Sequence, residues 1–277
     1  MKKFFALYVI AILMVVLGTS TSRAGTIAHW MFEEGTSGAT ASGAGTIIDS
    51  SVNNLHGTAL GGPVYQDGLK SGTGNTGLRF DGVDDTVRVS SGSTGPLALT
   101  GDFTIELGVN AQPPNALGFG VFYGDTQSGK DPYYLYLNGD GRLTFQIYGG
   151  PGGSDTLSTA DGVLDFGRTT HVAAVFDYDE VNGTDNMMSI YVDRMLVASV
   201  NAGATTPFYG DTVSDFWMGS LHNNGNPGRY YRGDLTDVKI SNEALTESEM
   251  MLVPEPGMLA IFGAGLFALG FARRKRR

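Results

Sequence analysis

The sequence has no cysteine, few charged side chains and no long apolar run outside its two ends. Without cysteine, disulfide bridges, thiolate catalysis and cysteine-based zinc sites are excluded. Only 17% of the residues are charged, but 42% are hydrophobic and 10% aromatic, so the composition is not that of a disordered chain. A protein without disulfides must draw its stability from a buried core, with or without the help of a bound ion.

Basic residues are scarce in the middle of the chain. Of the 18 lysines and arginines, three lie in residues 1–24 and five in residues 273–277. The middle of the chain holds the remaining lysines and arginines together with nearly all of the 28 carboxylates. Its net charge is therefore roughly −18. Nucleic acid and anionic membrane surfaces are therefore poor partners for it. The acidic surface is either simply solvated or binds divalent cations.

Catalytic motifs are also missing. The chain has no G-x-S-x-G elbow, no phosphate-binding loop and no E-x-D-x-x-E triplet of the kind that some glycoside hydrolases place on one strand. Its four histidines, His29, His56, His171 and His222, lack metal-ligand spacing. The sequence gives no positive signal for an enzyme, and a polysaccharide-active glycoside hydrolase with an unusual carboxylate arrangement stays open as an alternative.

The first apolar run lies at the N-terminus. Residues 1–24 combine a basic start at Lys2 and Lys3, an apolar run over residues 4–17, and small residues at Ser22 and Ala24. This order of charged, apolar and small residues is typical of a secretory signal peptide. The sequence therefore predicts export, and the folded domain is expected over residues 25–252.

The second apolar run belongs to the C-terminal segment, residues 253–277. Pro254, Glu255 and Pro256 precede the apolar residues 257–272, which as a helix would span roughly 24 Å of a ~30 Å hydrocarbon core. Five basic residues at 273–277 end the chain. The arrangement resembles the PEP-CTERM sorting signal, which implies a transmembrane helix processed by an exosortase. A plain membrane anchor is the alternative, and in both cases only this segment contacts the membrane.

The resemblance also implies a location. An exported protein with this signal is expected at the cell surface, in the outer envelope or in the extracellular matrix of a Gram-negative-type bacterium. Cleavage of the segment would release the domain or attach it there, whereas a retained segment would anchor it.

Short runs rich in Val, Ile, Tyr, Phe and Thr, separated by Gly, Asn and Asp turns, fill the middle of the chain. This pattern, without helical periodicity or internal repeats, predicts one all-β sandwich. Residues 133–137 and 142–148 are expected to pair as a hairpin. Residues 81–85 should form the turn between two further strands.

The closing stretch predicts a long strand and a short helix. Val238 and Ile240 share one face at the two-residue period, and a β-bulge at 236–237 would bring Leu235 onto the same face. Residues 246–249 have the pattern of a capping box, which predicts a last helix of one or two turns.

Several segments in order resemble laminin-G-like domains of the concanavalin A-like lectin/glucanase superfamily. They are WMFEEG at 30–35, DSSVNNLHG at 49–57, LRFDGVDDTVRV at 78–89, FTIELGV at 103–109 and GDLTDVKISNEALTESE at 233–249. The resemblance implies a jelly roll of two antiparallel sheets in which the first strand pairs with the last long strand. Thr236 and Gly108 depart from the family pattern, which often has an acidic and an aromatic residue there.

A calcium ion is the cofactor that the resemblance implies. Glu33, Asp49 and Asp237 would supply its carboxylate oxygens where the first and last strands meet the first loop. A second possibility is the loop 177–183, which echoes a D-x-D-x-N-G pattern with one residue too many.

Tyrosine rings are the candidate sugar contacts. We select Tyr134, Tyr136, Tyr230 and Tyr231, with Asn224 from the asparagine-rich stretch beside the last two. Alternate residues of a strand point to opposite faces, so Tyr134 and Tyr136 should share one face. The predicted function is a non-catalytic, lectin-like domain that binds extracellular polysaccharide or a surface glycan. A hydrolase and a purely structural matrix protein are the alternatives.

Overall fold

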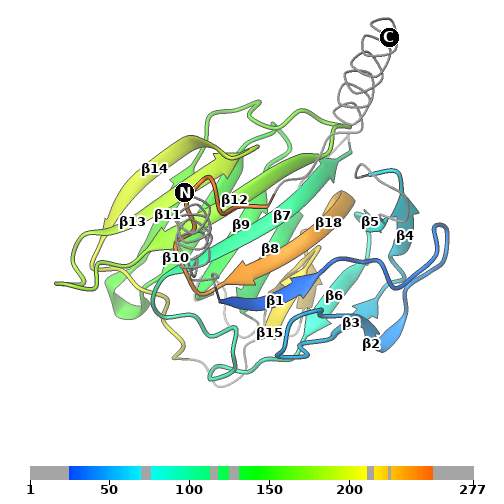
Figure 1. Ribbon diagram of the computed structural model, residues 1–277, viewed down its shortest axis with the longest axis horizontal. Helices are drawn as coiled ribbons and strands as arrows, with labels where there is room; N and C mark the ends of the chain where they lie inside the picture. The colour runs from blue at the N-terminus through cyan, green and yellow to red at the C-terminus, as the bar shows by residue number, and fades with distance from the viewer. Residues whose placement is uncertain are drawn as a thin grey trace, which may run out of the picture.

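The computed structural model describes residues 25–69, 76–112, 118–124, 131–210, 215–223 and 226–251 (Figure 1). They form two stacked eight-stranded antiparallel sheets, a small two-stranded ribbon and a single 3-10 turn, Gly150–Gly152. This confirms the predicted all-β sandwich. The predicted signal peptide and C-terminal apolar segment lie outside the described residues, and within those residues no helix is long and apolar enough to cross a membrane.

Figure 1 looks onto the first sheet, with the second sheet behind it. The first sheet has the order β14 (Met195–Gly203), β13 (Asn186–Val192), β12 (Thr170–Asp177), β7 (Phe103–Ala111), β18 (Arg232–Ser241), β5 (Thr76–Asp81) and β4 (Val64–Asp67), with β1 (Thr26–Trp30) also paired to β18. The second has the order β11 (Ser154–Ser158), β10 (Leu143–Tyr148), β9 (Tyr133–Leu137), β8 (Gly118–Gly124), β15 (Asp215–Met218), β6 (Thr86–Val89), β3 (Gly57–Leu60) and β2 (Gly43–Ile47). The ribbon consists of β16 (Leu221–Asn223) and β17 (Asn226–Gly228).

The two ends of the domain meet in the first sheet. Strand β1 pairs with β18, so that Trp30 lies opposite Val238. The register between β18 and β7 shifts between Thr236 and Val238, which makes Asp237 the extra residue of a β-bulge. Because of this bulge, Leu235, Val238 and Ile240 are all fully buried on the core side. The predicted strand pairing and the predicted bulge are confirmed.

The core lies between the sheets and is rich in aromatic rings. Trp30 of the first sheet stacks on Phe216 of the second, with ring centroids 5.4 Å apart. Phe103 contacts Phe145 and Tyr133 of the second sheet, at centroid distances of 6.1 and 5.3 Å. These contacts join the layers without any disulfide, as the absence of cysteine requires.

The C-terminal segment 242–251 covers the outer face of the first sheet, but not as the predicted helix. The Thr246 amide donates to Glu249 Oε2 at 3.0 Å, as a capping box requires. Only one hydrogen-bonded turn forms, because Met250 then packs against β12 and the Met251 amide donates to the Glu106 carboxylate of β7. These contacts draw the chain out of a helix after that turn.

Candidate functional site

One row of side chains crosses seven strands on the outer face of the second sheet. Directly opposite pairs on neighbouring strands define it in the order Thr58, Arg88, Trp217, Phe122, Tyr134, Gln146 and Thr156. We call these seven residues the cross-strand row. Their neighbours along each strand, such as Leu135 and Phe145, point into the core, so the row faces away from it.

The middle of the cross-strand row is aromatic. Phe122 and Tyr134 stack with ring centroids 6.4 Å apart. Trp217 and Tyr136 pack with these two rings in one apolar cluster. His222 of β16 lies parallel to the Trp217 indole at 4.1 Å, and the Arg88 guanidinium lies 5.6 Å from the same ring. Trp217 is consequently only 3% exposed, so the aromatic row opens to solvent mainly at Tyr134.

The cross-strand row becomes polar beyond Tyr134. The Tyr134 hydroxyl donates to Gln146 Oε1 at 2.6 Å, and the Thr156 hydroxyl donates to the same oxygen at 3.3 Å. Burial is the main reason that the pKa of Tyr134 rises to about 12, helped by the charge of Asp131. The hydroxyl therefore stays protonated at physiological pH and remains a donor. The amide group of Gln146 and the Thr156 hydroxyl offer further hydrogen-bonding groups beside an aromatic ring.

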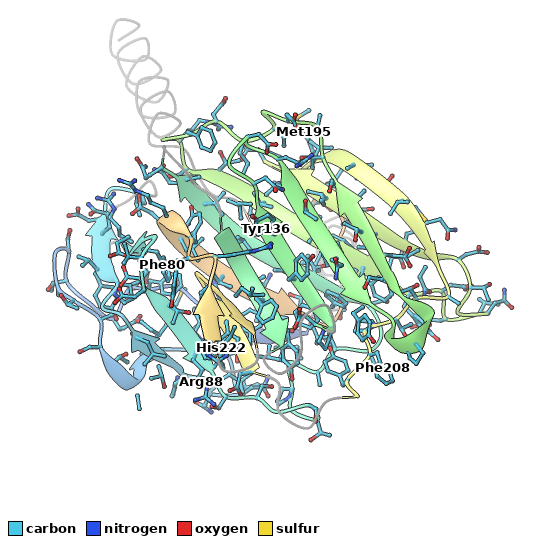
Figure 2. The ribbon with its side chains drawn as sticks, turned by 180° about the vertical axis from the view of Figure 1, so that it is seen from behind. Phe80, Arg88, Tyr136, Met195, Phe208 and His222 are labelled. Atoms are coloured by element: carbon cyan, nitrogen blue, oxygen red, sulfur yellow. The ribbon has the colours of Figure 1, made fainter. Side chains whose placement is uncertain are left out.

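A second cation lies near the row. The exposed Arg229 places its guanidinium 5.9 Å from the centre of the Tyr136 ring. Arg88 at the other end is held by Asp215, with Nε to Oδ2 at 2.7 Å. Figure 2 looks onto this face of the molecule, where Arg88, Tyr136 and His222 are labelled. The face thus combines rings, guanidinium groups and an amide.

The predicted tyrosines divide into two groups. Tyr134 and Tyr136 share the outer face as expected, whereas Tyr133 is fully buried in the core. Tyr231 is also fully buried, and its hydroxyl donates to the Asp234 carbonyl at 3.2 Å. Tyr231 is therefore a core residue and is withdrawn from the site, because a ligand cannot reach its ring.

Within the part of the chain that the structure describes, Tyr230 makes no ring contact with the pair on β9. Tyr230 is half-buried, and its pKa is raised by burial and by the charge of Asp84, which places it near the turn between β5 and β6. Asn224 lies outside the described residues. Sequence reasoning missed Arg88, Phe122, Trp217 and Gln146, because only the strand register reveals that they are neighbours.

The predicted calcium ligands are not brought together. Asp49 accepts hydrogen bonds from the amides of His29, Ser51 and Leu55 and from the Ser51 hydroxyl, at 2.7–2.9 Å. Asp237 lies 3.4 Å from His29 Nε2, and Glu33 is exposed. Within the described residues, Glu33, Asp49 and Asp237 do not form a group of neighbouring ligand atoms. The Asp49 carboxylate instead stabilises its own loop through these hydrogen bonds. Calcium binding stays a prediction.

The loop 177–183 is organised in a similar way. The Asp179 carboxylate accepts the amides of Val181, Asn182 and Thr184 at 3.0–3.4 Å. These bonds come from the turn between β12 and β13, so the carboxylate closes that turn. The expectation that this carboxylate binds calcium gains no support.

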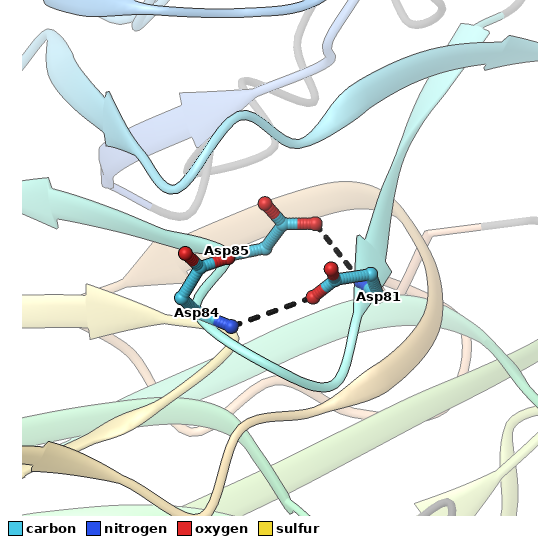
Figure 3. Close-up of side chains that lie close together, drawn as sticks. All are labelled: Asp81, Asp84 and Asp85. Atoms are coloured by element: carbon cyan, nitrogen blue, oxygen red, sulfur yellow. Dashed lines mark hydrogen bonds between the residues drawn. The ribbon is translucent and has the colours of Figure 1, made fainter.

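Another acidic group appears in the turn between β5 and β6 (Figure 3). Ligand oxygens of Asp81, Asp84 and Asp85 lie within 4.8 Å of one another. Asp85 Oδ2 accepts the Asp81 amide at 2.9 Å, and Asp81 Oδ1 accepts the amides of Val83 and Asp84. Asp81 and Asp85 also line a pocket of about 410 Å³. The DGVDD stretch had indicated only a turn.

The environment of the Asp85 carboxyl leads us to expect that the stability of the protein depends on pH. Burial and the charges of Asp81 and Asp84 raise its pKa from 3.8 to about 6, against the lowering effect of the Asp81 amide. Between these values the folded state holds a proton that the unfolded state has lost, so stability falls as pH rises from about 4 to about 6. Asp85→Asn should therefore raise the melting temperature more at neutral pH than at about pH 4.

Thermal unfolding of both proteins at the two pH values checks this prediction. Asp161→Asn is the matched control, because the Asp161 side chain is 70% exposed and its neutralisation should have no comparable pH dependence. An equal gain for Asp85→Asn at both pH values would contradict the raised pKa.

Two family models match the chain. The model described as the concanavalin A-like lectin/glucanases superfamily, of laminin-G type, matches residues 80–251. The PEP-CTERM protein-sorting motif matches residues 252–277. No curated protein matches the chain in sequence. The sorting motif marks an exported protein that is sorted to the cell envelope.

Solved structures show similarity to the fold. The binding domain of botulinum neurotoxin DC, in complex with rat synaptotagmin II, has a TM-score of 0.56 at 11% identity and covers 81% of this chain and 50% of that one. A variant of the NanB sialidase from Streptococcus pneumoniae has a TM-score of 0.51 at 18% identity, over 64% and 27% of the two chains. The carbohydrate-binding module of a Ruminococcus gnavus sialidase, bound to sialyllactose, has a TM-score of 0.49 at 17% identity, over 62% and 92%.

At these identities the first two solved structures show a shared fold and no more. The family model carries the assignment, because it covers more than half of the chain and the structure has the two antiparallel sheets expected of this superfamily. The chain belongs to the concanavalin A-like lectin/glucanase superfamily and ends in a PEP-CTERM protein-sorting motif.

Proposed function

We propose that this exported protein binds glycans without cleaving them, through the outer face of its second sheet. The observation that supports this is the cross-strand row, in which Tyr134 lies between buried rings on one side and Gln146 on the other. An aromatic ring offers a flat apolar surface to the C–H face of a sugar. The neighbouring amide and hydroxyl groups can bond the sugar hydroxyls that surround that face.

The ring is held in place before any ligand arrives. Tyr134 stacks on Phe122 and its hydroxyl is fixed by Gln146 at 2.6 Å. A side chain that is already ordered loses little conformational freedom on binding, which favours affinity. The location agrees with this role, since the sorting motif brings the domain to the cell envelope, where polysaccharide is available. An exosortase is the proposed processing partner.

A glycan array with the full chain tests the proposal. It should include sialylated glycans, because one similar domain, that of botulinum neurotoxin DC, was solved in complex with SialylT. Running the array with calcium and with a chelator would also test the proposed cofactor. Binding of no glycan under either condition would favour the third interpretation, a structural matrix protein without a specific ligand.

Tyr134→Ala should weaken binding of the glycan selected by the array by about tenfold or more, because a stacking surface of one ring is lost. Tyr134→Phe keeps the ring and loses the bond to Gln146, so its effect should be smaller. Tyr191→Ala is the matched control, since Tyr191 is a half-buried tyrosine on the first sheet. Calorimetry on the three variants measures the affinities. Equal affinities for Tyr134→Ala and the wild type would place the site elsewhere.

Glycoside hydrolysis has one observation in its favour. Asp81 and Asp85 line the same pocket, their oxygens lie within 4.8 Å, and the pKa of Asp85 is raised to about 6. Retaining glycosidases use two carboxyl groups about 5–5.5 Å apart, one of them with a raised pKa. Binding is preferred because Asp81 Oδ1 is already occupied by two amides of its own turn. Release of reducing sugar that Asp85→Asn abolishes would reverse this preference.

A further inference from the structure

A second pair of rings lies on the same face as the cross-strand row, at the end of β10. Tyr148 and Phe208 meet edge to face, with ring centroids 6.2 Å apart. The Phe208 amide donates to the Tyr148 carbonyl at 2.9 Å. Phe208 is nevertheless 44% exposed. An exposed phenylalanine that is fixed at both backbone and ring is unlike a solvated surface side chain.

Two glycines hold the exposed ring. A Cβ atom on Gly150 would lie 2.9 Å from the Phe208 ring, and one on Gly210 would lie 2.2 Å from it. Backbone can therefore approach the ring closely only because these positions carry no side chain. Gly150 also has a φ of +76°, which few other residues adopt without strain. The ring is thus seated against backbone, and part of its surface stays open to solvent.

The second pair of rings continues the cross-strand row. Tyr148 is two residues beyond Gln146 on β10, so both point to the same face. Gln146 is directly opposite Tyr134, which makes Tyr148 the diagonal neighbour of Tyr134 at roughly 7–8 Å. Hydroxyl groups lie beside this path, because Thr144 bonds Ser158 at 3.0 Å and Thr156 bonds Gln146. Two sets of rings are therefore separated by a polar, uncharged surface.

We propose that Tyr148 and Phe208 form a second sugar-binding subsite, and that the ligand is an extended polysaccharide chain lying across β9, β10 and β11. This inference rests on the proposed glycan-binding function and adds the form of the ligand. A terminal sugar needs one ring surface with hydrogen-bonding groups around it. Here two ring surfaces lie one diagonal apart, with hydroxyl and amide groups between them. This arrangement fits a polysaccharide chain, because its successive sugar units present apolar faces to the rings and hydroxyl groups at their edges.

The charge of this surface supports the same ligand. Gln146 and Thr156 are the side chains beside the diagonal from Tyr134 to Tyr148, and neither of them is charged. The guanidinium groups of Arg88 and Arg229 lie at the other part of the face, beside Trp217 and Tyr136. The second subsite is accordingly proposed for an uncharged stretch of sugar, whereas a charged substituent would be accommodated near the arginines.

The experiment compares chain lengths. The full chain would be titrated with monosaccharide and octasaccharide fragments of cellulose and of the polysaccharide that binds best on the array, and with fragments of alginate and polysialic acid, which are charged at every unit, for comparison. The octasaccharide of an uncharged polysaccharide should bind the wild type about tenfold more tightly than the monosaccharide, because a single sugar unit covers only one ring surface. Phe208→Ala should abolish that gain and leave the monosaccharide affinity unchanged.

Phe166→Ala is the matched control, because Phe166 is an exposed phenylalanine, at 39%, in the loop before β12. Phe208→Tyr should keep the gain, and circular dichroism would show whether each variant is folded. An affinity independent of chain length, or an equal loss in Phe166→Ala and Phe208→Ala, would overturn the second subsite while the proposed function stood. Absence of binding to fragments of every length would instead overturn the proposed function.

Discussion

Glu106→Ala should lower the free energy of unfolding by about 3–5 kcal/mol, the usual cost of breaking a buried ion pair on one side. Glu106 is fully buried, and its carboxylate lies 3.1 Å from both His171 Nε2 and Lys239 Nζ. Burial raises the pKa of Glu106, but the hydrogen bond with His171 and the charge of Lys239 outweigh this and hold it below its ordinary value. Removal of the carboxylate would leave the cation and the Met251 amide without their acceptor.

The lowered pKa gives this prediction a pH signature. A carboxyl with a lowered folded-state pKa stabilises the folded state above its ordinary pKa, and the contribution disappears as pH falls through the folded value. The difference between wild type and Glu106→Ala, measured by urea unfolding, should therefore be large near neutrality and shrink in acid. Glu180→Ala, at an exposed carboxylate, is the control. The double variant Glu106→Met/Lys239→Met should recover much of the loss, since no buried charge remains.

Trp30→Ala should cost about 3–5 kcal/mol of unfolding free energy, as expected for a large aromatic residue removed from a packed core. Trp30 is fully buried, joins β1 to β18 and stacks on Phe216 of the opposite sheet. Its indole also donates to the Leu55 carbonyl at 2.8 Å. The substitution therefore opens a cavity between the sheets and leaves that carbonyl without its donor.

Denaturant unfolding followed by circular dichroism measures this loss. Trp30→Phe keeps a ring against Phe216 and should lose less than Trp30→Ala. Val52→Ala is the control, because Val52 is 89% exposed and its truncation should stay within about 0.5 kcal/mol. If Trp30→Ala also lost no more than about 0.5 kcal/mol of unfolding free energy, the contact between the sheets would contribute little to stability.

The strand pattern of the chain was predictable because burial leaves a period of two in the sequence. Val238 and Ile240 showed that period, and the out-of-step Leu235 located the bulge that the structure has at Asp237. Pairing of β1 with β18 followed from the family resemblance rather than from alternation, since residues this far apart leave no local trace of their contact. The capping box at Thr246 and Glu249 formed as predicted, but the chain makes one hydrogen-bonded turn and no regular helix, because Met250 then packs on the first sheet and Met251 bonds Glu106.

The candidate site was predictable only in part. Alternation on β9 placed Tyr134 and Tyr136 together, but it could not show that Trp217 and Gln146 flank them, because neighbours across a sheet depend on register and strand order. The prediction that Tyr231 contacts sugar was wrong, because its ring is buried in the core. The sequence does not distinguish the two cases, since aromatic residues occur both in cores and on binding faces. The acidic residues Asp49 and Asp179 looked like ligands, and the structure shows that backbone amides occupy them.

The hydrogen bond from Met251 to Glu106 bears on any processing of the C-terminal segment. Met251 is the residue immediately before the matched sorting motif, which begins at residue 252. The described part of the domain is therefore bonded to the first sheet up to the residue where the matched motif begins. A processing enzyme that works near residue 252 would have to approach flush against the first sheet or first pull the last strap of chain away from it. Such an enzyme would then meet a chain that is held at Met251 by a buried carboxylate of the domain.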